Sequence, residues 1–280
     1  MGECDFKVTI IGLGLIGASY AKALKKLDFK TVWGVDLSSE VLSKAEKYGI
    51  IDEGFLKPEN ALEASDIVII ALYPKATLNF VKKYKEHFRK NSIITDTAGL
   101  KASIVSEIQE ILPENVEFVG GHPMAGKEGK GLEMSSEAIF EGANYIITPS
   151  EKNKAESLEF IEQLAYRMGC GKVITMSPEE HDKIIAYTSQ LTHALAVSMV
   201  NCCEADVKAF IGNGFKDLTR IAINNSSLWS ELLIENRENL IGKIGDFQRE
   251  LEEIKRALIK QDENYIREKF EKANIKRKGL

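Results

Sequence analysis

The sequence has little of what marks several specialised classes of protein. Among 280 residues there are four cysteines and four histidines, and the cysteines (Cys4, Cys170, Cys202, Cys203) show neither a CxxC pattern nor a metal-ligand spacing with histidine. We therefore expect reduced thiols, no disulfide and no metal site. Because no basic segment and apolar core open the chain, we expect no signal peptide, a mature start near Met1 and a cytoplasmic location.

An excess of positive charge and long apolar runs are missing as well. Lys and Arg number 37 against 42 Asp and Glu, which gives a net charge of -5 and no general electrostatic reason to bind nucleic acid. The most apolar helical pattern is interrupted by polar residues at 189, 190, 192 and 193, so we expect no membrane span. What is present, 44% hydrophobic and 28% charged residues, is typical of a soluble protein with one large core or two modest ones, and we expect two domains.

The first 175 residues alternate short apolar runs with helical patterns. Strands are expected at 7–11, 31–36, 67–71, 93–96, 116–120, 144–148 and 172–175, and helices at 16–26, 39–48 and 77–88. This alternation is typical of a parallel sheet covered on both faces. We predict an α/β domain over residues 1–175 with a doubly wound parallel sheet, that is, a Rossmann domain.

Helical patterns alone follow, at 181–210, 216–223, 228–260 and 263–273, which predicts an all-α domain over residues 176–280. The segment 181–210 carries apolar residues on nearly every side, as a helix buried in a helical assembly does. About 100 residues of such helix with no sheet to cover indicate a core shared between two subunits. We expect a homodimer through this domain, with an isolated helical bundle as the alternative.

The first chemical motif is Gly12-Leu13-Gly14-Leu15-Ile16-Gly17, which follows a strand and opens a helix. In this pattern Gly12 allows the tight turn, Gly14 lets the backbone approach a pyrophosphate, and Gly17 lets the helix pack on the strand. Asp36 ends the second strand, where a carboxylate can accept hydrogen bonds from both ribose hydroxyls and would repel a 2'-phosphate. The motif indicates NAD rather than NADP, and a glycine turn needed only for packing is the alternative.

The second motif is the stretch Gly120-Gly121-His122-Pro123-Met124-Ala125-Gly126, placed after the fifth strand. Open parallel sheets bind ligands at this carboxyl edge, and we interpret the glycines as permitting close backbone approach. His122 is then aimed at the cleft, where a neutral imidazole can act as a general base. A hydrogen-bonded structural histidine is the alternative.

Together these blocks resemble the prephenate/arogenate dehydrogenase family, with further matches in a Thr95-Asp96-x-x-x-x-Lys101 turn and at 140–145, 181–182, 189–193 and 214–222. The resemblance implies a Rossmann domain, a helical dimerisation domain and an active site in the cleft between them. It implies NAD-dependent oxidative decarboxylation of prephenate to 4-hydroxyphenylpyruvate in tyrosine biosynthesis, with arogenate as the alternative substrate. Since no chorismate mutase segment precedes the fingerprint, we expect the monofunctional form.

The same resemblance assigns roles to individual residues. His122 is the base, and the substrate-binding residues are Arg220, His193, Gln190, Ser189, Lys216 and Trp229. Arg220 can donate two parallel hydrogen bonds to a carboxylate, and the alternative for this residue is a surface ion pair. For Trp229 the alternative is interface packing. Pro74 and Thr97 are assigned to the cofactor. His181 lies about 120° from His193 on a continuous helix, so we interpret His181 and Asp182 as a helix-start feature.

Two positions depart from the family pattern. Gly99 stands where many relatives have a serine that can bond the catalytic histidine, and Gln190 stands where they have a histidine. The sequence therefore leaves open whether another group such as Thr97, backbone or water holds His122, or whether His122 is less well oriented than in those relatives. It also leaves open which substrate is preferred. Two further alternatives remain: a β-hydroxyacid dehydrogenase-like oxidoreductase, whose lysine would sit mid-helix, and a non-catalytic NAD-sensing dimer.

Overall fold

The computed structural model describes residues 3–126, 129–203 and 207–279. In this part of the chain one sheet holds β1 (Lys7–Ile11), β2 (Thr31–Val35), β3 (Glu53–Phe55), β4 (Ile67–Ile70), β5 (Ile93–Asp96), β6 (Glu117–Pro123), β7 (Asn144–Thr148) and β8 (Lys172–Thr175). The helices are α1 (Leu15–Lys26), α2 (Ser39–Lys47), α3 (Glu59–Ala64), α4 (Pro74–Tyr84), α5 (Ala102–Ile111), α6 (Ala155–Arg167), α7 (Pro178–Ile185), α8 (Leu191–Asn201), α9 (Asn213–Thr219), α10 (Ser226–Glu235), α11 (Arg237–Lys260) and α12 (Glu263–Lys278).

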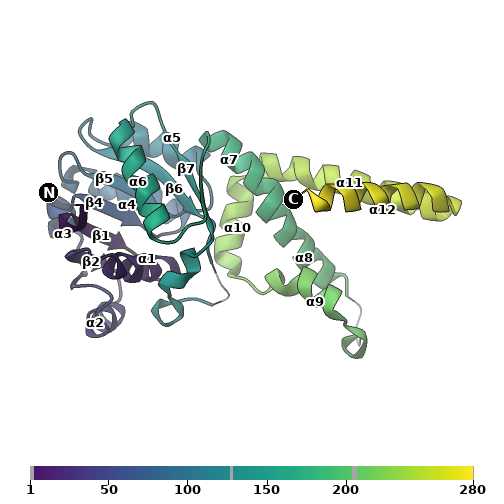
Figure 1. Ribbon diagram of the computed structural model, residues 1–280, viewed down its shortest axis with the longest axis horizontal. Coiled ribbons are helices and arrows are strands. Elements are labelled where there is room, and N and C mark those ends of the chain that lie inside the picture. The colour runs from purple at the N-terminus through teal and green to yellow at the C-terminus, as the bar shows by residue number, and fades with distance from the viewer. Residues whose placement is uncertain (1–2, 127–128, 204–206, 280) are drawn as a thin grey trace. The chain divides into compact units, whose positions relative to one another are not determined.

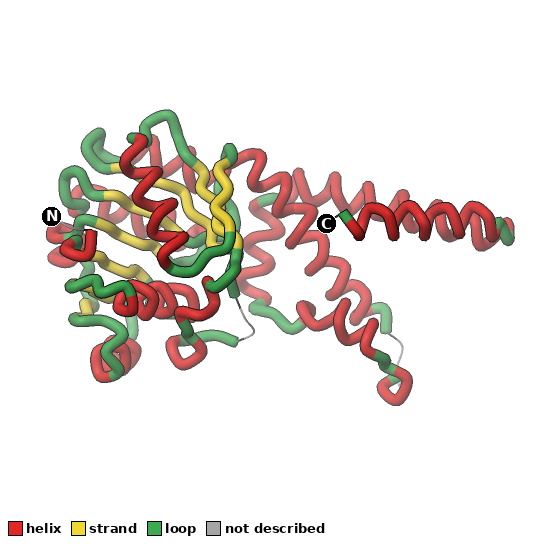
Figure 2. The backbone as a smooth tube through the Cα atoms, viewed as in Figure 1, coloured by secondary structure: helices red, strands yellow, loops and turns green. Residues whose placement is uncertain are grey.

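The strand order is β3-β2-β1-β4-β5-β6-β7-β8, so the chain direction across the sheet reverses between β1 and β4 (Figures 1 and 2). Every pair from β3 to β6 is parallel, which is the predicted doubly wound arrangement. Two details differ from the prediction: the three-residue β3 was too short to leave a pattern, and β7 runs antiparallel to β6. The connection into β7 explains the second, because its described residues form short 3-10 turns instead of a crossover helix.

The two faces of the sheet carry separate apolar cores. Alternation along β1 sends Val8 and Ile10 into one core, with side chains of α1 and α6, and Ile11 into the other, with side chains of α4 and α5. Figure 1 shows α1 and α6 on the same face of the strands. All four residues of β4 are buried, as a central strand covered on both faces requires. The carboxyl ends of the parallel strands therefore form one rigid edge on which loops can place functional groups.

By packing, the chain divides into a first unit, Met1–Ile185 with Asn224–Leu232, and a second unit, Ala186–Ile223 with Leu233–Leu280. The first unit takes in α7 and the segment Asn224–Leu232, whereas the sequence placed everything after residue 175 in the helical domain. The reason is apolar contact: Leu100, Ile185 and Leu232 form a small buried cluster with the first unit's own residues. The described elements of the second unit are helical.

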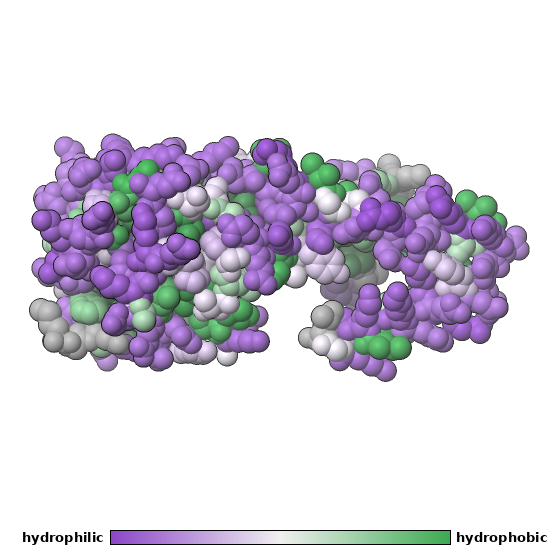
Figure 3. Space-filling model, turned by 90° about the horizontal axis from the view of Figure 1, so that it is seen from above, coloured by the Kyte–Doolittle hydropathy of each residue, from purple (hydrophilic) through white to green (hydrophobic). Residues whose placement is uncertain are grey.

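The predicted single helix over 181–210 is interrupted. After α7 comes a π-helical segment, Ala186–Gln190, and then α8, which ends at Asn201. The second unit leaves many large apolar side chains exposed, and apolar residues reach the molecular surface in Figure 3. These side chains include Val200, Phe210, Leu218, Ile223, Ile234, Ile241, Leu251, Leu258, Ile259, Phe270 and Ile275. Among the described residues no helix combines the length and the apolar character that a membrane span needs.

Candidate active site

The glycine turn after β1 shows a different physical reason for each glycine. Gly12 has φ +88°, and a Cβ there would lie 2.8 Å from the carbonyl oxygen of Ala71. A Cβ on Gly17 would lie 1.9 Å from the carbonyl oxygen of Gly12, so the helix could not approach the strand. A Cβ on Gly14 would meet open space in the described structure. Gly14 thus leaves exposed backbone at the N-terminus of α1, where the helix dipole favours an anion such as a pyrophosphate.

Asp36 lies directly after β2, partly buried, beside this turn. Its Oδ2 accepts a hydrogen bond from the Leu13 N–H at 2.9 Å, and its Oδ1 accepts one from the Ser38 N–H at 2.9 Å. Each carboxylate oxygen retains capacity for a further hydrogen bond, so the group can still accept from ribose hydroxyls. The side chain of Leu13 is buried, and its N–H donates to Asp36. The residue after Asp36, Leu37, is 97% exposed.

The remaining residues assigned to the cofactor lie at the same carboxyl edge. Leu15 and Ile16 are in the first turn of α1 and are partly buried. Pro74 is the first residue of α4, where its missing N–H costs nothing. Thr97 follows β5, is partly exposed and donates its N–H to the Ile70 carbonyl at 3.1 Å. The structure therefore brings the predicted cofactor residues to neighbouring strand ends.

A buried ion pair fixes the turn after β5. Asp96 and Lys101 are both fully buried, and the Lys101 ammonium contacts Asp96 Oδ2. Asp96 also accepts from the Ala98 N–H at 3.0 Å and, across to β6, from the Gly121 N–H at 3.1 Å. Burial lowers the pKa of Lys101, and the adjacent Asp96 carboxylate acts in the opposite direction. This pair ties the turn to the strand that carries His122.

The Gly-Gly-His-Pro motif is part of β6, which extends three residues beyond the predicted strand because Gly120–Pro123 pairs with β7. A Cβ on Gly120 would lie 2.3 Å from Thr148 Oγ1, and one on Gly121 would lie 2.5 Å from Tyr145 Oη. The sequence-based interpretation is that these glycines permit close backbone approach at the ligand edge of the sheet. In the structure they make room for the side chains of β7, and His122 is the residue that the pairing holds in place.

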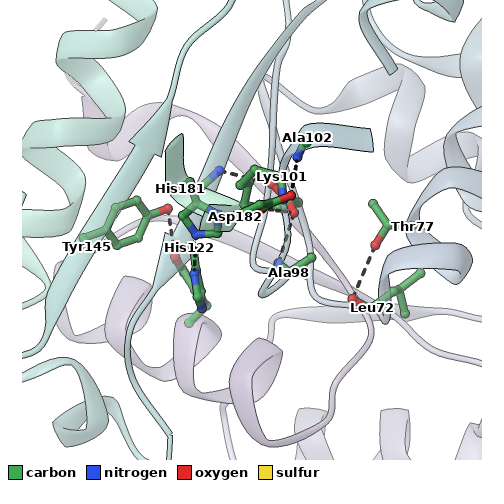
Figure 4. A network of polar contacts seen from close by, with 12 residues as sticks. Leu72, Thr77, Ala98, Lys101, Ala102, His122, Tyr145, His181 and Asp182 are labelled. Carbon is green, nitrogen blue, oxygen red and sulfur yellow. Dashed lines mark hydrogen bonds and ion pairs between the residues drawn. The ribbon is translucent and has the colours of Figure 1, made fainter. Parts of the chain in front are cut away.

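The imidazole of His122 is the first member of a hydrogen-bonded chain (Figure 4). Its Nδ1 lies 2.9 Å from Nε2 of His181, and Nδ1 of His181 lies 2.7 Å from Oδ1 of Asp182. The Asp182 carboxylate in turn accepts from the Lys101 N–H and the Ala102 N–H, both at 2.9 Å. Asp182 thus caps the N-terminus of α5 while it contacts His181.

This chain corrects two expectations from the sequence. The group that holds His122 is His181, whereas Thr97 was the side chain named as an example, and the interpretation of His181 as a helix-start feature missed this contact. Sequence reasoning placed His181 and His193 on one continuous helix, but the π-helical segment Ala186–Gln190 lies between them. A signal was available, since a buried histidine followed by an aspartate needs partners for both side chains.

The environment of His122 keeps its imidazole neutral. Burial lowers the pKa of His122 well below its ordinary value, and the neighbouring His181 and Lys101 side chains lower it further. A Cβ on Gly99 would lie 3.9 Å from Nε2 of His122 and 3.9 Å from Cδ2 of Leu232. The backbone of Gly99 lies outside the left-handed region. Gly99 therefore faces the ring nitrogen on the opposite side from His181.

The second unit holds most of the predicted substrate-binding residues. His193 is partly buried on α8, its Nδ1 donates to the Ser189 carbonyl at 3.0 Å, and burial lowers its pKa. The short turn that begins at Arg220 packs against α8, and Arg220 is exposed. Lys216, on α9, is exposed. Within this unit the structure brings the elements that carry His193 and Arg220 side by side.

Gln190 and Trp229 are placed differently from the rest. Gln190 is 1% exposed, and its Oε1 accepts from the Asn236 Nδ2 at 2.8 Å, so its amide takes part in the helical core. Trp229, on α10, is partly buried and packs against the Leu100, Ile185 and Leu232 cluster of the first unit. Gln190 therefore contacts its own unit through its amide, and Trp229 contacts its own unit through apolar packing.

Comparison with known proteins agrees with this architecture. Residues 20–175 match the prephenate dehydrogenase nucleotide-binding domain family, and residues 177–272 match the prephenate dehydrogenase dimerization domain family. The chain belongs to the prephenate dehydrogenase family. Over 98% of its length it is 34% identical to a prephenate dehydrogenase of Lactococcus lactis, and over its whole length 31% identical to one of Bacillus subtilis, each aligned over 77% of the relative.

A solved structure is similar throughout. The prephenate dehydrogenase of Aquifex aeolicus, crystallised with hydroxyphenyl propionate and NAD+, superposes with a TM-score of 0.89 at 32% identity and 97% coverage of both chains. The match includes the sheet and the helical part, so the family assignment covers both units and does not rest on the glycine turn alone.

Proposed function

We propose that this protein is an NAD-dependent prephenate dehydrogenase, which oxidises and decarboxylates prephenate to 4-hydroxyphenylpyruvate. The observation that carries the proposal is His122: a neutral imidazole at the carboxyl edge of the sheet, on the strand next to the one that positions Thr97. A neutral imidazole is what a base for a hydroxyl proton requires. Membership of the prephenate dehydrogenase family supports the substrate class.

The reaction follows from what each group can do. His122 accepts the proton of the C4 hydroxyl while the C4 hydrogen leaves as hydride, and the C1 carboxylate leaves as carbon dioxide with its bonding electrons retained by the ring. NAD, when bound, supplies the hydride acceptor. The proton on His122 then returns to the phenolate oxygen, so His122 is regenerated. Since aromatisation of the ring drives the step, the protein has mainly to position the reactants and hold this proton.

The exposed cation Arg220 is proposed to bind a substrate carboxylate, because a guanidinium can donate two parallel hydrogen bonds to it. His193, Ser189 and Lys216 are proposed as further substrate-binding residues, and Trp229 as one that closes the pocket. Gln190 is proposed with them, and its amide oxygen accepts from Asn236 in the core of the second unit.

The cofactor is proposed to be NAD because of Asp36. Its carboxylate lies beside the open backbone of Gly14 and is bonded to the backbone N–H of Leu13 and Ser38, so it is held in place to accept ribose hydroxyls. A 2'-phosphate would meet a negative charge there, with no arginine in residues 37–39 to compensate.

We propose a homodimer formed through the helical unit. The match to a dimerization domain family and the many exposed apolar side chains of that unit, among them Phe210 (87% exposed) and Ile223 (86%), support this. Sedimentation at several protein concentrations would measure the mass, and a monomer throughout would contradict the proposal.

The test of the function is a direct assay. We expect NADH to form when the protein is mixed with NAD and prephenate, less with NADP at equal subsaturating concentration, and we expect His122→Asn to lower kcat by roughly 10²–10⁴-fold with KM largely kept. His87→Asn is the matched control, since that histidine is partly exposed and pairs with Glu63. Arogenate and a β-hydroxyacid are assayed in parallel. Turnover of either in place of prephenate, or full activity of His122→Asn, would contradict the proposal.

A further inference from the structure

The hydrogen-bonded chain behind His122 has a direction that can be worked out from its far end. The Asp182 carboxylate is buried against the start of α5, where two backbone N–H groups donate to it. Each oxygen of this carboxylate accepts from an N–H group, so the carboxylate acts as an acceptor in the chain. The proton between Asp182 and His181 must therefore sit on Nδ1 of His181.

The next link follows from the first. A neutral imidazole with its proton on Nδ1 has a bare Nε2, which can only accept. His181 Nε2 lies 2.9 Å from Nδ1 of His122, so the proton of that contact sits on His122 Nδ1. The remaining nitrogen of His122, Nε2, is then the bare one. It is the nitrogen that faces Gly99.

We propose that Asp182 and His181 are positioning residues that set the tautomer of His122, with Nδ1 protonated and Nε2 bare, and so define Nε2 as the atom that accepts the substrate proton. This inference rests on the proposed function for the identity of that proton, whereas the tautomer itself does not depend on it. The hydrogen-bonded chain also stabilises the protonated state of His122. When Nε2 takes up the proton, the resulting cation donates from Nδ1 to His181, which is bonded to the Asp182 carboxylate.

The competing arrangement would place the Nε2 proton on His122 and require His181 to donate from both nitrogens as a cation. His181 is fully buried, and the Lys101 ammonium, also fully buried, is bonded to Asp96 in the same network. A second buried cation there would be costly to desolvate. The low pKa of His122 agrees with a network that is neutral at its histidines before the reaction.

This network also accounts for the glycine at position 99. A serine at 99 would lie on the Nε2 side of His122, whereas His181 holds the Nδ1 side. The ring is therefore fixed from the side away from the substrate proton, and no side chain at 99 is needed to hold it. The serine hydroxyl that Gly99 lacks is thus replaced, as a partner of His122, by His181 on α7.

The first test is spectroscopic and needs no substrate. In protein labelled with ¹⁵N at histidine, the four histidines are few enough to resolve, and His122→Asn identifies the signals of His122. We expect His122 of the full-length wild type, at neutral pH, to carry its proton on Nδ1, with a nitrogen shift typical of a bare ring nitrogen at Nε2. An Nε2-protonated His122 would overturn the proposal, whatever the enzyme's activity.

The second test uses variants with a chemical contrast. His181→Asn retains a group near Nδ1 that can bond Asp182 but loses the acceptor at the Nε2 position, and we expect kcat with prephenate to fall roughly 10²-fold while KM changes little and His122 loses its single tautomer. His181→Gln can place an amide oxygen near that position and should recover part of kcat and of the Nδ1–H signal. His87→Asn is the control for loss of a carboxylate-paired histidine.

The outcomes separate the two proposals. If wild type is inactive on prephenate but His122 has the expected tautomer, the proposed function fails and the positioning network stands. If His181→Asn is folded by its melting curve and keeps kcat and the tautomer of His122, the network fails and the function stands. Should His181→Asn unfold, the wild-type tautomer decides, since a mixed or Nε2–H tautomer of His122 in the wild type overturns the proposal.

Discussion

The two units of the molecule hold their functional groups by different means. In the first unit, Asp96, Lys101 and His181 are buried, and each is bonded to a side chain or backbone group at a neighbouring strand end or helix start. In the second unit, Arg220 and Lys216 are exposed on short helical turns. The first unit fixes its polar side chains by several hydrogen bonds, and the second presents its charged groups at the surface.

The cores of the units differ in the same sense. Both faces of the sheet bury their own apolar clusters, whereas the described helices of the second unit bury few apolar residues, such as Leu191, Leu240 and Ala257. A helical unit that keeps so much apolar surface exposed needs something to cover it, which the proposed homodimer would supply. The comparison predicts that changes in the first unit act on folding and geometry, and changes in the second on substrate affinity and assembly.

The largest effect should come from breaking the buried ion pair. Lys101→Met leaves the Asp96 carboxylate buried without its counter-charge, and we expect the free energy of unfolding to fall by about 3–5 kcal/mol. Lys82→Met is the matched control, because Lys82 and Glu107 form an exposed pair in the same unit and should contribute little. Denaturant unfolding measures both. The double change Asp96→Asn with Lys101→Met should cost less than Lys101→Met alone, and a larger loss would contradict this account.

In the second unit the expected effect falls on catalysis and leaves folding intact. Arg220→Ala should lower kcat/KM for prephenate roughly 10–10²-fold, because a charge-assisted hydrogen bond to a carboxylate is lost, with the KM for NAD and the melting temperature near wild type. Arg220→Lys should recover part of the loss, since a point charge replaces the fork. Arg237→Ala, another exposed arginine of this unit, is the control. Unchanged kcat/KM in Arg220→Ala would remove this residue from the site.

A smaller effect is expected on the pH dependence of the free energy of unfolding, to which each unit contributes one histidine. Burial lowers the pKa of His122 in the first unit and of His193 in the second, below the ordinary value of 6.5. As pH falls below 6.5, each histidine takes up a proton in the unfolded chain and not in the folded one, so the free energy of unfolding should decrease. By the same shift the acid limb of kcat/KM should lie below pH 6.5.

The two histidines should contribute unequally to this decrease. The Ser189 carbonyl raises the pKa of His193 against burial, whereas His181 and Lys101 lower that of His122 further. His122→Asn should therefore flatten the pH dependence of stability more than His193→Asn does. Unfolding curves at several pH values give both slopes. A steeper dependence in His122→Asn than in wild type would contradict the burial argument.

Much of the first unit could be predicted because its constraints are local in sequence. The glycine spacing, the alternation in β1 and the acid after β2 each report a short-range requirement, and the parallel strands from β3 to β6 agree with the predicted doubly wound sheet. The antiparallel β7 could not be predicted in this way, because an apolar run carries no direction. His181 was missed because its partner, His122, is 59 residues away and a π-helical segment changes the periodicity after it.

The second unit was harder to predict for a related reason. A helical pattern reports the buried face of a helix, and the exposed apolar side chains here blur that face, so 181–210 was taken as one helix. The turn that begins at Arg220 packs against α8, and no local sequence pattern reports this contact. The assignment of Arg220 to the substrate came from the resemblance to the family. Periodicity alone would have indicated only a cation at the surface.

The smallest effect is expected at Gly99, and it tests whether the first unit's geometry depends on that residue. A serine Cβ there would lie 3.9 Å from His122 Nε2, which is ordinary contact, on a backbone that L residues adopt. Gly99→Ser should therefore keep the wild-type melting temperature and change kcat by no more than a few-fold, with mild activation if the hydroxyl helps to orient the substrate oxygen. Gly121→Ser is the contrast, because its Cβ would lie 2.5 Å from Tyr145 Oη and should destabilise the fold. A well-folded Gly99→Ser enzyme with sharply reduced kcat would show that Nε2 requires the open space beside it.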